Sequence, residues 1–249
     1  MIYYFSGTGN SLHVARHLAD ALGDQLSPMT YLRPVEDEVI GLVFPVHAWG
    51  IPNVVEKAVS LLLPRGGETY LYAVMTCGDD MGYADRILDK VLRSACGKTL
   101  DAAFSVQMPN TYICLPGFDV DSDALCKEKL TREEIAVKEI AACVSERKSV
   151  RRLTRGGFPW IKTYVLRPLF NRFLLTDKYF HVDAARCISC GRCRKMCPVG
   201  NIIIDEVPVW QSHCTGCLAC YHACPHHAIN FGSMTQKKGQ YSIMKQLYG

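Results

Sequence analysis

The sequence predicts an α/β protein with a doubly wound parallel sheet, followed by a small cysteine-rich domain. Continuous apolar runs alternate with helical patterns over residues 1–150, and this alternation is typical of parallel strands joined by right-handed crossovers. Eight of the thirteen cysteines lie between Cys187 and Cys224. A glycine- and hydroxyl-rich loop, FSGTGNS, follows the first strand within the first eleven residues. These three observations divide the chain and indicate a chemistry for each part.

The strands are predicted from β-branched, aromatic and continuous apolar segments. They fall at residues 1–6, 39–46, 70–77 and, more weakly, 102–108. Helices are predicted between them from apolar residues that recur at helical spacing. Their apolar positions are Leu12, Ala15, Leu18, Ala19 and Leu22; Val55, Val59 and Leu62; and Ala84, Leu88, Val91 and Leu92. A last helix is predicted over residues 130–144, where Thr131 and Glu134 have the spacing of a capping box.

The loop after the first strand has the composition of an anion site. It joins that strand to the N-terminus of a helix, where unpaired N–H groups and the helix dipole favour a phosphate. Gly7 and Gly9 allow close backbone approach, and Ser6, Thr8, Asn10 and Ser11 can donate hydrogen bonds. A P-loop would need a lysine here, and a dinucleotide fingerprint would need a third glycine, where Leu12 stands. A serine- and threonine-rich helix cap with no ligand is the alternative.

A hydroxyl-rich, lysine-free loop in this position resembles the flavin-phosphate loop of flavodoxins. The resemblance implies a flavodoxin-like sheet of order 2-1-3-4-5, with FMN at the carboxyl ends of the strands. It implies a cofactor site built from the loops that leave those ends, with Trp49 stacking on the flavin ring. The expected residues are Ser6, Gly7, Thr8, Gly9, Asn10, Ser11, Pro45, Val46, His47, Ala48, Trp49, Gly50, Thr76, Cys77, Gly78, Gly82, Asn110 and Tyr112. Core packing is the alternative for Trp49, and a structural role is favoured for His47.

Two cysteine runs in the second half share one spacing, C-x2-C-x2-C-x3-C-P. They begin at Cys187 and Cys214, so they repeat with a period of 27. This is the run of bacterial two-cluster ferredoxins, in which the fourth cysteine of each run binds the other cluster. One cluster is expected on Cys187, Cys190, Cys193 and Cys224, and the other on Cys214, Cys217, Cys220 and Cys197. Zinc is the competing metal, but zinc sites use cysteine pairs with longer separations.

The segment between the two halves is basic and aromatic, RRLTRGGFPWIKTYVLRPLFNRFLL. A linker that packs across both domains is the favoured interpretation. Contact with a membrane surface and RNA binding are the alternatives. The expected organisation is a flavodoxin-like domain over residues 1–150, a linker over 151–180, and a two-cluster α+β ferredoxin-like domain over 181–249. Residues 109–129 are expected to form an insertion on the flavin side.

The whole chain resembles proteins that fuse a flavodoxin-like domain to a bacterial-type ferredoxin. The resemblance implies FMN, two [4Fe–4S] clusters and an electron-transfer role with redox protein partners, such as a ferredoxin or an oxidoreductase. An alternative is a flavoenzyme that reduces a small substrate, such as a quinone, with electrons from the clusters. A regulatory protein with vestigial cofactors is a third possibility. No nicotinamide-binding motif supports a direct reaction with NAD(P)H.

Charge and targeting signals complete the expectations. The formal net charge is +4, and two thiolate-bound clusters of roughly −2 each would cancel it. The net charge therefore gives no indication of a nucleic-acid partner, and none is expected. The sequence shows no signal-peptide pattern and no apolar run of membrane-spanning length, so a cytoplasmic location is expected. Peripheral membrane contact is not favoured, and the sequence leaves the oligomeric state undetermined.

Overall fold

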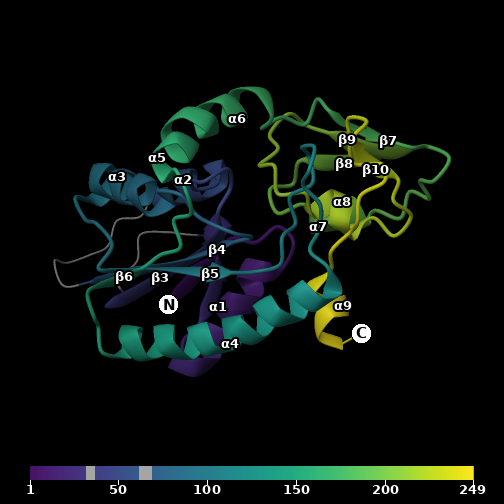
Figure 1. Ribbon diagram of the computed structural model, residues 1–249. Coiled ribbons are helices and arrows are strands. Elements are labelled where there is room, and N and C mark those ends of the chain that lie inside the picture. The colour runs from purple at the N-terminus through teal and green to yellow at the C-terminus, as the bar shows by residue number, and fades with distance from the viewer. Residues whose placement is uncertain (32–36, 62–68, 249) are drawn as a thin grey trace.

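The computed structural model describes residues 1–31, 37–61 and 69–248 as two joined parts, a layered α/β unit and a smaller C-terminal unit (Figure 1). Leu62, predicted on the second helix, lies outside the described residues. Among the described residues, no helix has both the length and the apolar character to cross a membrane.

The first part is a parallel sheet of six strands. These are β1 (Ile2–Tyr4), β2 (Leu26–Pro28), β3 (Val39–Pro45), β4 (Tyr70–Cys77), β5 (Ala102–Gln107) and β6 (Val150–Arg152). Their order is β2-β1-β3-β4-β5-β6 and every pair is parallel. The predicted flavodoxin-like order is therefore confirmed, with β6 as an added edge strand. Since β6 pairs with β5, the sheet includes two residues beyond position 150.

Helices cover both faces of this sheet. They are α1 (Asn10–Leu22) and α4 (Asp123–Ser145) on one face, and α2 (Asn53–Val59) and α3 (Ala84–Cys96) on the other. The fully buried strand β4 shows why both faces are covered. Tyr72 and Val74 pack toward α1 and α4, and Leu71, Ala73 and Met75 pack toward α2 and α3, as the two-residue period of a strand requires. The short 3-10 helix η1 (Met29–Tyr31) follows β2.

The helix α4 begins earlier than its sequence indicates. Ser122 is its N-cap, and the Ser122 hydroxyl accepts a hydrogen bond from the Leu125 N–H at 3.4 Å. Thr131 lies in the helix interior, where its hydroxyl donates to the Lys127 carbonyl at 3.0 Å. The predicted capping box at Thr131 and Glu134 is therefore wrong. The expected insertion consists of a loop that is followed by the first turns of α4.

A helical segment connects the sheet to the C-terminal unit. It comprises α5 (Pro159–Ile161), the π-helical turn η2 (Lys162–Leu166) and α6 (Arg167–Phe173). The buried Thr163 hydroxyl donates to the Trp49 carbonyl at 3.1 Å, and Arg167 donates to the Ile51 carbonyl at 2.7 Å. The neighbouring Trp160 and Phe173 remain 59% and 56% exposed. The segment thus docks on the sheet domain through polar contacts, and much of its apolar surface stays in solvent.

The C-terminal unit is built around two short helices and two two-stranded antiparallel sheets. β7 (Phe180–Val182) pairs with β10 (Ile229–Phe231), and β8 (Ile202–Asp205) pairs with β9 (Val207–Trp210). The helices are α7 (Arg192–Met196) and α8 (Ala219–Ala223). The chain then returns to the sheet domain, where α9 (Ile243–Tyr248) lies beside α4 (Figure 1).

Candidate functional site

The loop between β1 and α1 leaves the helix N-terminus available to a ligand. Gly9 is the N-cap, with φ of 102°, and makes no side-chain cap. Only glycine adopts this conformation without strain. The Ser6 hydroxyl accepts a hydrogen bond from the Gly9 N–H at 3.2 Å, which closes the loop into a tight turn. The first-turn N–H groups of α1 therefore face the end of the sheet without a capping side chain.

A cavity opens at the carboxyl ends of β1, β3, β4 and β5, beside this loop. Its empty space measures about 770 Å³, part of which is open to solvent. The lining residues come from four sheet-domain loops, from the connecting segment and from the second cysteine run. Those predicted from sequence are Ser6, Gly7, Thr8, Asn10, Ser11, Pro45, Val46, His47, Ala48, Thr76, Cys77, Gly78, Asn110 and Tyr112. The structure thus brings most of the predicted flavin-site residues together at one place.

Four predicted residues do not line the cavity: Gly9, Trp49, Gly50 and Gly82. Gly9 forms the turn that leads into α1 and is not among the residues that line the cavity. The Trp49 ring lies 5.7 Å from the Lys162 ammonium, on the side of the connecting segment. A Cβ on Gly50 would overlap the Arg167 side chain, and a Cβ on Gly82 would overlap Thr163 and Trp49. These residues therefore support the connecting segment, and the structure does not place Trp49 where it could stack on a ligand in the cavity.

Tyr112 is an aromatic residue that lines the cavity, whereas Trp49 does not line it. Its ring lies 5.7 Å from Phe170 and 5.5 Å from Phe118. The buried Tyr112 hydroxyl has no hydrogen-bond partner among the described residues, and burial raises its pKa. An unpartnered buried hydroxyl is costly, so this group at the cavity wall suits a polar ligand atom.

Some of the predicted donors are already engaged in holding the loops together. The Ser11 and Thr76 hydroxyls lie 2.8 Å apart in hydrogen-bond contact. The Asn10 amide donates to the Pro109 carbonyl at 2.8 Å and accepts from the Tyr241 hydroxyl at 2.6 Å. Asn10 and Ser11 therefore fix the cavity walls. The Ser6 and Thr8 hydroxyls remain as candidate phosphate donors.

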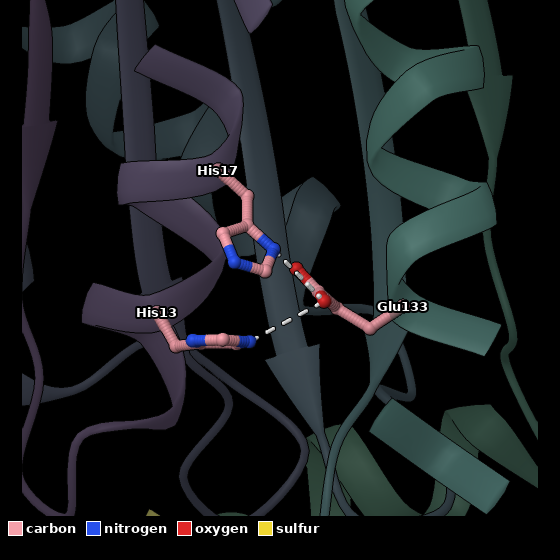
Figure 2. A group of neighbouring side chains, drawn as sticks. All are labelled: His13, His17 and Glu133. Carbon is pink, nitrogen blue, oxygen red and sulfur yellow. Dashed lines mark ion pairs between the residues drawn. The ribbon is translucent and has the colours of Figure 1, made fainter. Parts of the chain in front are cut away.

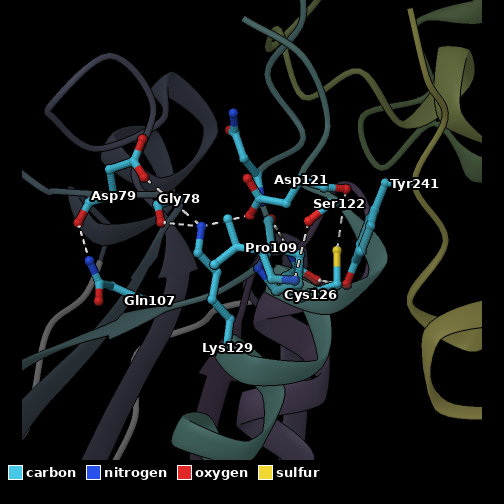
Figure 3. Close-up of polar contacts among 12 residues, drawn as sticks. Gly78, Asp79, Gln107, Pro109, Asp121, Ser122, Cys126, Lys129 and Tyr241 are labelled. Atoms are coloured by element: carbon cyan, nitrogen blue, oxygen red, sulfur yellow. Dashed lines mark hydrogen bonds and ion pairs between the residues drawn. The ribbon is translucent and has the colours of Figure 1, made fainter.

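Lys129 is a buried cation that sequence reasoning missed, and Figure 3 shows its contacts. Its ammonium donates to the Gly78 carbonyl at 2.8 Å and to the Asp121 carboxylate at 2.6 Å. Asp121 also accepts from the Asn110 N–H at 2.9 Å. Lys129 thereby ties the loop after β4 to the loop after β5. In the sequence, Lys129 stands at the end of the expected insertion, just before the predicted helix, and a lysine in such a position usually marks a solvated surface.

The eight cysteines of the two runs form two groups. One small cavity is lined by Cys187, Cys190, Cys193 and Cys224, and another is lined by Cys197, Cys214, Cys217 and Cys220. The fourth cysteine of each run lies at the cavity of the other run, and the backbone conformation at that residue explains why. Cys197 and Cys224 stand at the C-caps of α7 and α8 in extended conformation, so each leaves its own run. The structure thus places the four cysteines of each expected ligand set around one cavity.

Backbone N–H groups approach several of these sulfurs. Asn201 donates to the Cys197 Sγ at 3.2 Å, and Ala228 donates to the Cys224 Sγ at 3.3 Å. Burial raises the pKa of the Cys214 thiol to about 11 and that of Cys217 to about 12. Hydrogen bonds and burial of this kind set the potential of a bound iron–sulfur cluster.

Cys217 connects the two kinds of site. It lines both the sheet-domain cavity and the second cysteine cavity. A Cβ on Gly7 would lie 2.6 Å from the Cys217 Cβ and 3.2 Å from its sulfur. The loop after β1 and the second cysteine run are therefore packed directly against each other.

Neighbouring residues fix this junction. The Thr215 hydroxyl donates to the Asn53 side chain at 2.6 Å. The His47 ring is partly accessible from the cavity but hydrogen-bonds to the Thr215 backbone, and desolvation lowers its pKa to about 4. At the other side, His222 Nε2 lies 2.8 Å from the Thr111 carbonyl. Residues of the C-terminal unit thus complete one wall of the cavity.

Comparisons with known proteins agree with this geometry. A family model described as a 4Fe-4S dicluster domain matches residues 180–225. The chain is 36% identical over 63 residues to an uncharacterized ferredoxin of Methanocaldococcus jannaschii, covering 23% of this chain and 82% of that protein. It is 37% identical over 51 residues to the pyruvate synthase subunit PorD of the same organism, covering 19% of this chain and 59% of PorD.

The match to a larger protein covers only a small part of each chain. The chain is 44% identical over 45 residues to one component of an ion-translocating oxidoreductase complex of Methanosarcina acetivorans, which is 17% of each protein. The chain thus spans well under two thirds of several curated relatives. A flavodoxin of Streptococcus pneumoniae has a TM-score of 0.37 at 17% identity, over 57% of this chain and 96% of that one. The flavodoxin-like fold is assigned here from the sheet order.

The fold and the cysteine site define an iron–sulfur electron-transfer protein joined to a flavodoxin-like domain. Through its C-terminal part, the chain belongs to the 4Fe–4S ferredoxin family.

Proposed function

We propose that this chain binds one FMN in the cavity beside Gly7 and two [4Fe–4S] clusters in the two cysteine cavities, and that it relays single electrons between them. The observation that carries the proposal is the position of Cys217, which lines both the candidate flavin cavity and one cysteine cavity. FMN would supply a centre that accepts one or two electrons, and the clusters would exchange one electron at a time.

The residues present fit a flavin mononucleotide. The uncapped N-terminus of α1 and the hydroxyls of Ser6 and Thr8 suit a phosphate. The apolar and aromatic wall around Tyr112 suits a ring system. The Tyr112 hydroxyl and the loop amides near Gly78 suit the polar edge of that ring. A Cβ on Gly78 would lie 3.0 Å from the Asn110 side chain, so the two loops are in close contact at this glycine.

The cysteine groups fit cubane clusters. Each cavity presents three cysteines from one run and the fourth from the other, as two-cluster ferredoxins do. We assign the cluster held by Cys197, Cys214, Cys217 and Cys220 as the one proximal to the flavin. The cluster held by Cys187, Cys190, Cys193 and Cys224 is then the distal one. Cys190 is exposed and Ile188 is 61% exposed, so the distal cluster lies near the surface where a partner could dock.

The walls of the cavity favour an electron carrier over a substrate reductase. The second cysteine run and the residues Phe170 and Leu175 close the side that faces away from the sheet. A flavin edge in this position faces the proximal cluster. The partners would be redox proteins such as a ferredoxin or an oxidoreductase. The thirteen cysteines suit a reducing compartment, for which we propose the cytoplasm.

Anaerobic purification of the full chain tests the proposal. We expect about eight irons, eight acid-labile sulfides and one FMN per chain. Thr8→Glu should lose FMN, because its carboxylate repels the phosphate, and should retain all the iron. Thr8→Ser is the matched control and should retain both. Wild-type FMN affinity in Thr8→Glu would refute the phosphate site, and zinc in place of iron would refute the cluster assignment.

A further inference from the structure

A second polar cluster lies away from the electron-transfer sites, between α1 and α4. His13 and His17 stand one turn apart on α1, and Glu133 faces them from α4 (Figure 2). Their ligand-type nitrogen and oxygen atoms all lie within 4.8 Å of one another. The proposed electron-transfer function uses none of these three residues.

Glu133 is an unusual residue for this position. Its side chain has no solvent exposure, and neither carboxylate oxygen has a hydrogen-bond partner among the described residues. The nearest helical lysine, Lys129, is committed to Gly78 and Asp121. Burial of a carboxylate without compensation is costly, so the Glu133 carboxylate requires a cationic partner.

Both histidine rings present a nitrogen to the same carboxylate oxygen. His13 Nε2 lies 3.5 Å and His17 Nδ1 lies 3.2 Å from Glu133 Oε2, yet neither contact has hydrogen-bond geometry. Two ligands at 2.0–2.1 Å from a tetrahedral ion are about 3.3 Å apart. The two nitrogen–oxygen separations are therefore those of ligands around a shared ion.

We propose that His13, His17 and Glu133 bind a divalent transition-metal ion, with Zn²⁺ as the best match. Two imidazoles and one carboxylate form a ligand set that suits Zn²⁺, whereas Mg²⁺ and Ca²⁺ prefer oxygen ligands alone. The His17 side chain is 36% exposed and that of His13 is 12% exposed. The ion thus enters from the His17 side, where water takes the fourth position.

The ion would act as a clamp on the candidate flavin site. His13 lies just after the loop that ends at Gly9, and Glu133 lies one turn beyond Lys129, which holds the two loops at the cavity rim. A metal that joins α1 to α4 fixes the phosphate-binding end of α1 relative to those loops. This role requires no redox change at the ion.

The test uses the full chain, prepared anaerobically with its iron–sulfur clusters, and titrated with Zn²⁺ against a fluorescent zinc chelator. One Zn²⁺ per chain should bind to the wild type. Glu133→Gln and His17→Gln should each weaken binding at least about 100-fold, since the loss of an outer hydrogen bond alone costs 10–100-fold. His181→Gln, which changes an exposed histidine of the C-terminal unit, should bind as the wild type does.

X-ray absorption at the zinc edge separates this site from the cysteines. The proposal requires nitrogen and oxygen ligands at about 2.0–2.1 Å and no sulfur at about 2.3 Å. Zn²⁺ should also raise the unfolding temperature of the wild type and leave that of His17→Gln unchanged. Sulfur ligands, failure of the wild type to bind Zn²⁺, or equal affinity in the wild type and both ligand variants would overturn the proposal.

Discussion

At the scale of single residues, Gly7 of the sheet domain packs directly against Cys217 of the second cysteine run. The contact depends on a missing side chain, because a Cβ on Gly7 would lie 2.6 Å from the Cys217 Cβ and 3.0 Å from its carbonyl oxygen. Both obstructing atoms belong to or adjoin the backbone, so neither can move aside by a rotamer change.

Gly7→Ala should therefore weaken the docking of the second cysteine run on the sheet domain. Overpacking of this kind costs about 1–3 kcal/mol. We expect slower electron transfer between clusters and flavin, measured by transient absorption, with the iron content unchanged. Gly157→Ala is the control, because a Cβ there meets no atom within 4 Å. Unchanged transfer in Gly7→Ala would show that this contact does not set the path.

His47 makes the stability of the fold depend on pH. Its pKa is lowered to about 4 in the folded chain, whereas an unfolded histidine titrates near 6.5. Above about pH 6.5 the ring is neutral in both states and has no effect on stability. Below that pH the unfolded chain binds one more proton, so the free energy of unfolding falls by roughly 1.4 kcal/mol per pH unit down to about pH 4.

Urea unfolding followed by circular dichroism between pH 7 and pH 5 measures this contribution. His47→Gln cannot take up the proton and should reduce the loss of stability by roughly 2 kcal/mol at pH 5. His181→Gln changes an exposed histidine and should leave the pH dependence of the wild type intact. Identical pH profiles for wild type and His47→Gln would contradict the burial of a neutral ring at the junction.

At the scale of secondary-structure elements, α7 and α8 distribute the cysteines between two cavities. Each helix ends at the fourth cysteine of its run, and that residue then turns toward the other cavity. The two cluster sites are thus interlocked, and the loss of one helix-end ligand should act on the site formed mainly by the other run.

Cys197→Ala should damage the proximal cluster, whose other ligands are Cys214, Cys217 and Cys220. The distal cluster should persist, because its four cysteines are untouched. Electron paramagnetic resonance of the dithionite-reduced protein, together with iron analysis, distinguishes the two clusters. Cys96→Ala, which changes a cysteine of α3 outside both groups, is the control. Selective loss of the cluster that holds Cys187 would contradict the crossed ligand scheme.

The sequence predicted the elements that have strong periodic patterns. The apolar runs at Val39 and Tyr70 form the central strands. The cysteine spacing predicted which cysteines lie around the same cavity. It did not reveal β2 and β6, because these short edge strands, Leu-Ser-Pro and Val-Arg-Arg, lack the apolar run of a strand that is buried on both faces. It also misplaced the start of α4, because Thr131 and Glu134 have the spacing of a capping box, whereas the N-cap of the helix is Ser122.

The site was predictable where it is built from the loops that leave the carboxyl ends of the strands. Ser6, Gly7 and Thr8 stand together in the sequence and line one wall of the cavity. Phe170, Leu175 and Cys217 line the opposite wall, but they come from segments whose docking no local pattern encodes. Trp49 shows the reverse case. The resemblance to flavodoxins implied that its ring stacks on the flavin, whereas Thr163 and Lys162 hold it under the connecting segment.

At the scale of the whole molecule, contacts from the C-terminal part fix the two units together. Lys238 donates to the carbonyls of Ile113, Leu115 and Phe118 at 2.6–2.7 Å, and Tyr241 donates to Asn10. The connecting segment adds Arg167 and Thr163 on the other side. The cysteine-rich unit is thereby attached to the sheet domain on two sides of the cavity.

This attachment has a kinetic consequence. A tether alone raises the effective concentration of one site at the other to about the millimolar range. The direct contacts also hold the two units together, so no diffusional encounter precedes electron transfer. Electron transfer between the clusters and the flavin should therefore occur within one molecule. Two independent carriers that merely share a chain would instead depend on encounters between molecules.

Flash reduction of the clusters in the anaerobic, fully loaded protein tests this central claim most directly. Flavin reduction is followed by its absorbance over a tenfold range of protein concentration. The account predicts one observed rate constant at every concentration, because the proximal cluster and the flavin belong to the same chain. An observed rate that rises in proportion to protein concentration would contradict it, even if the iron and FMN contents are as expected.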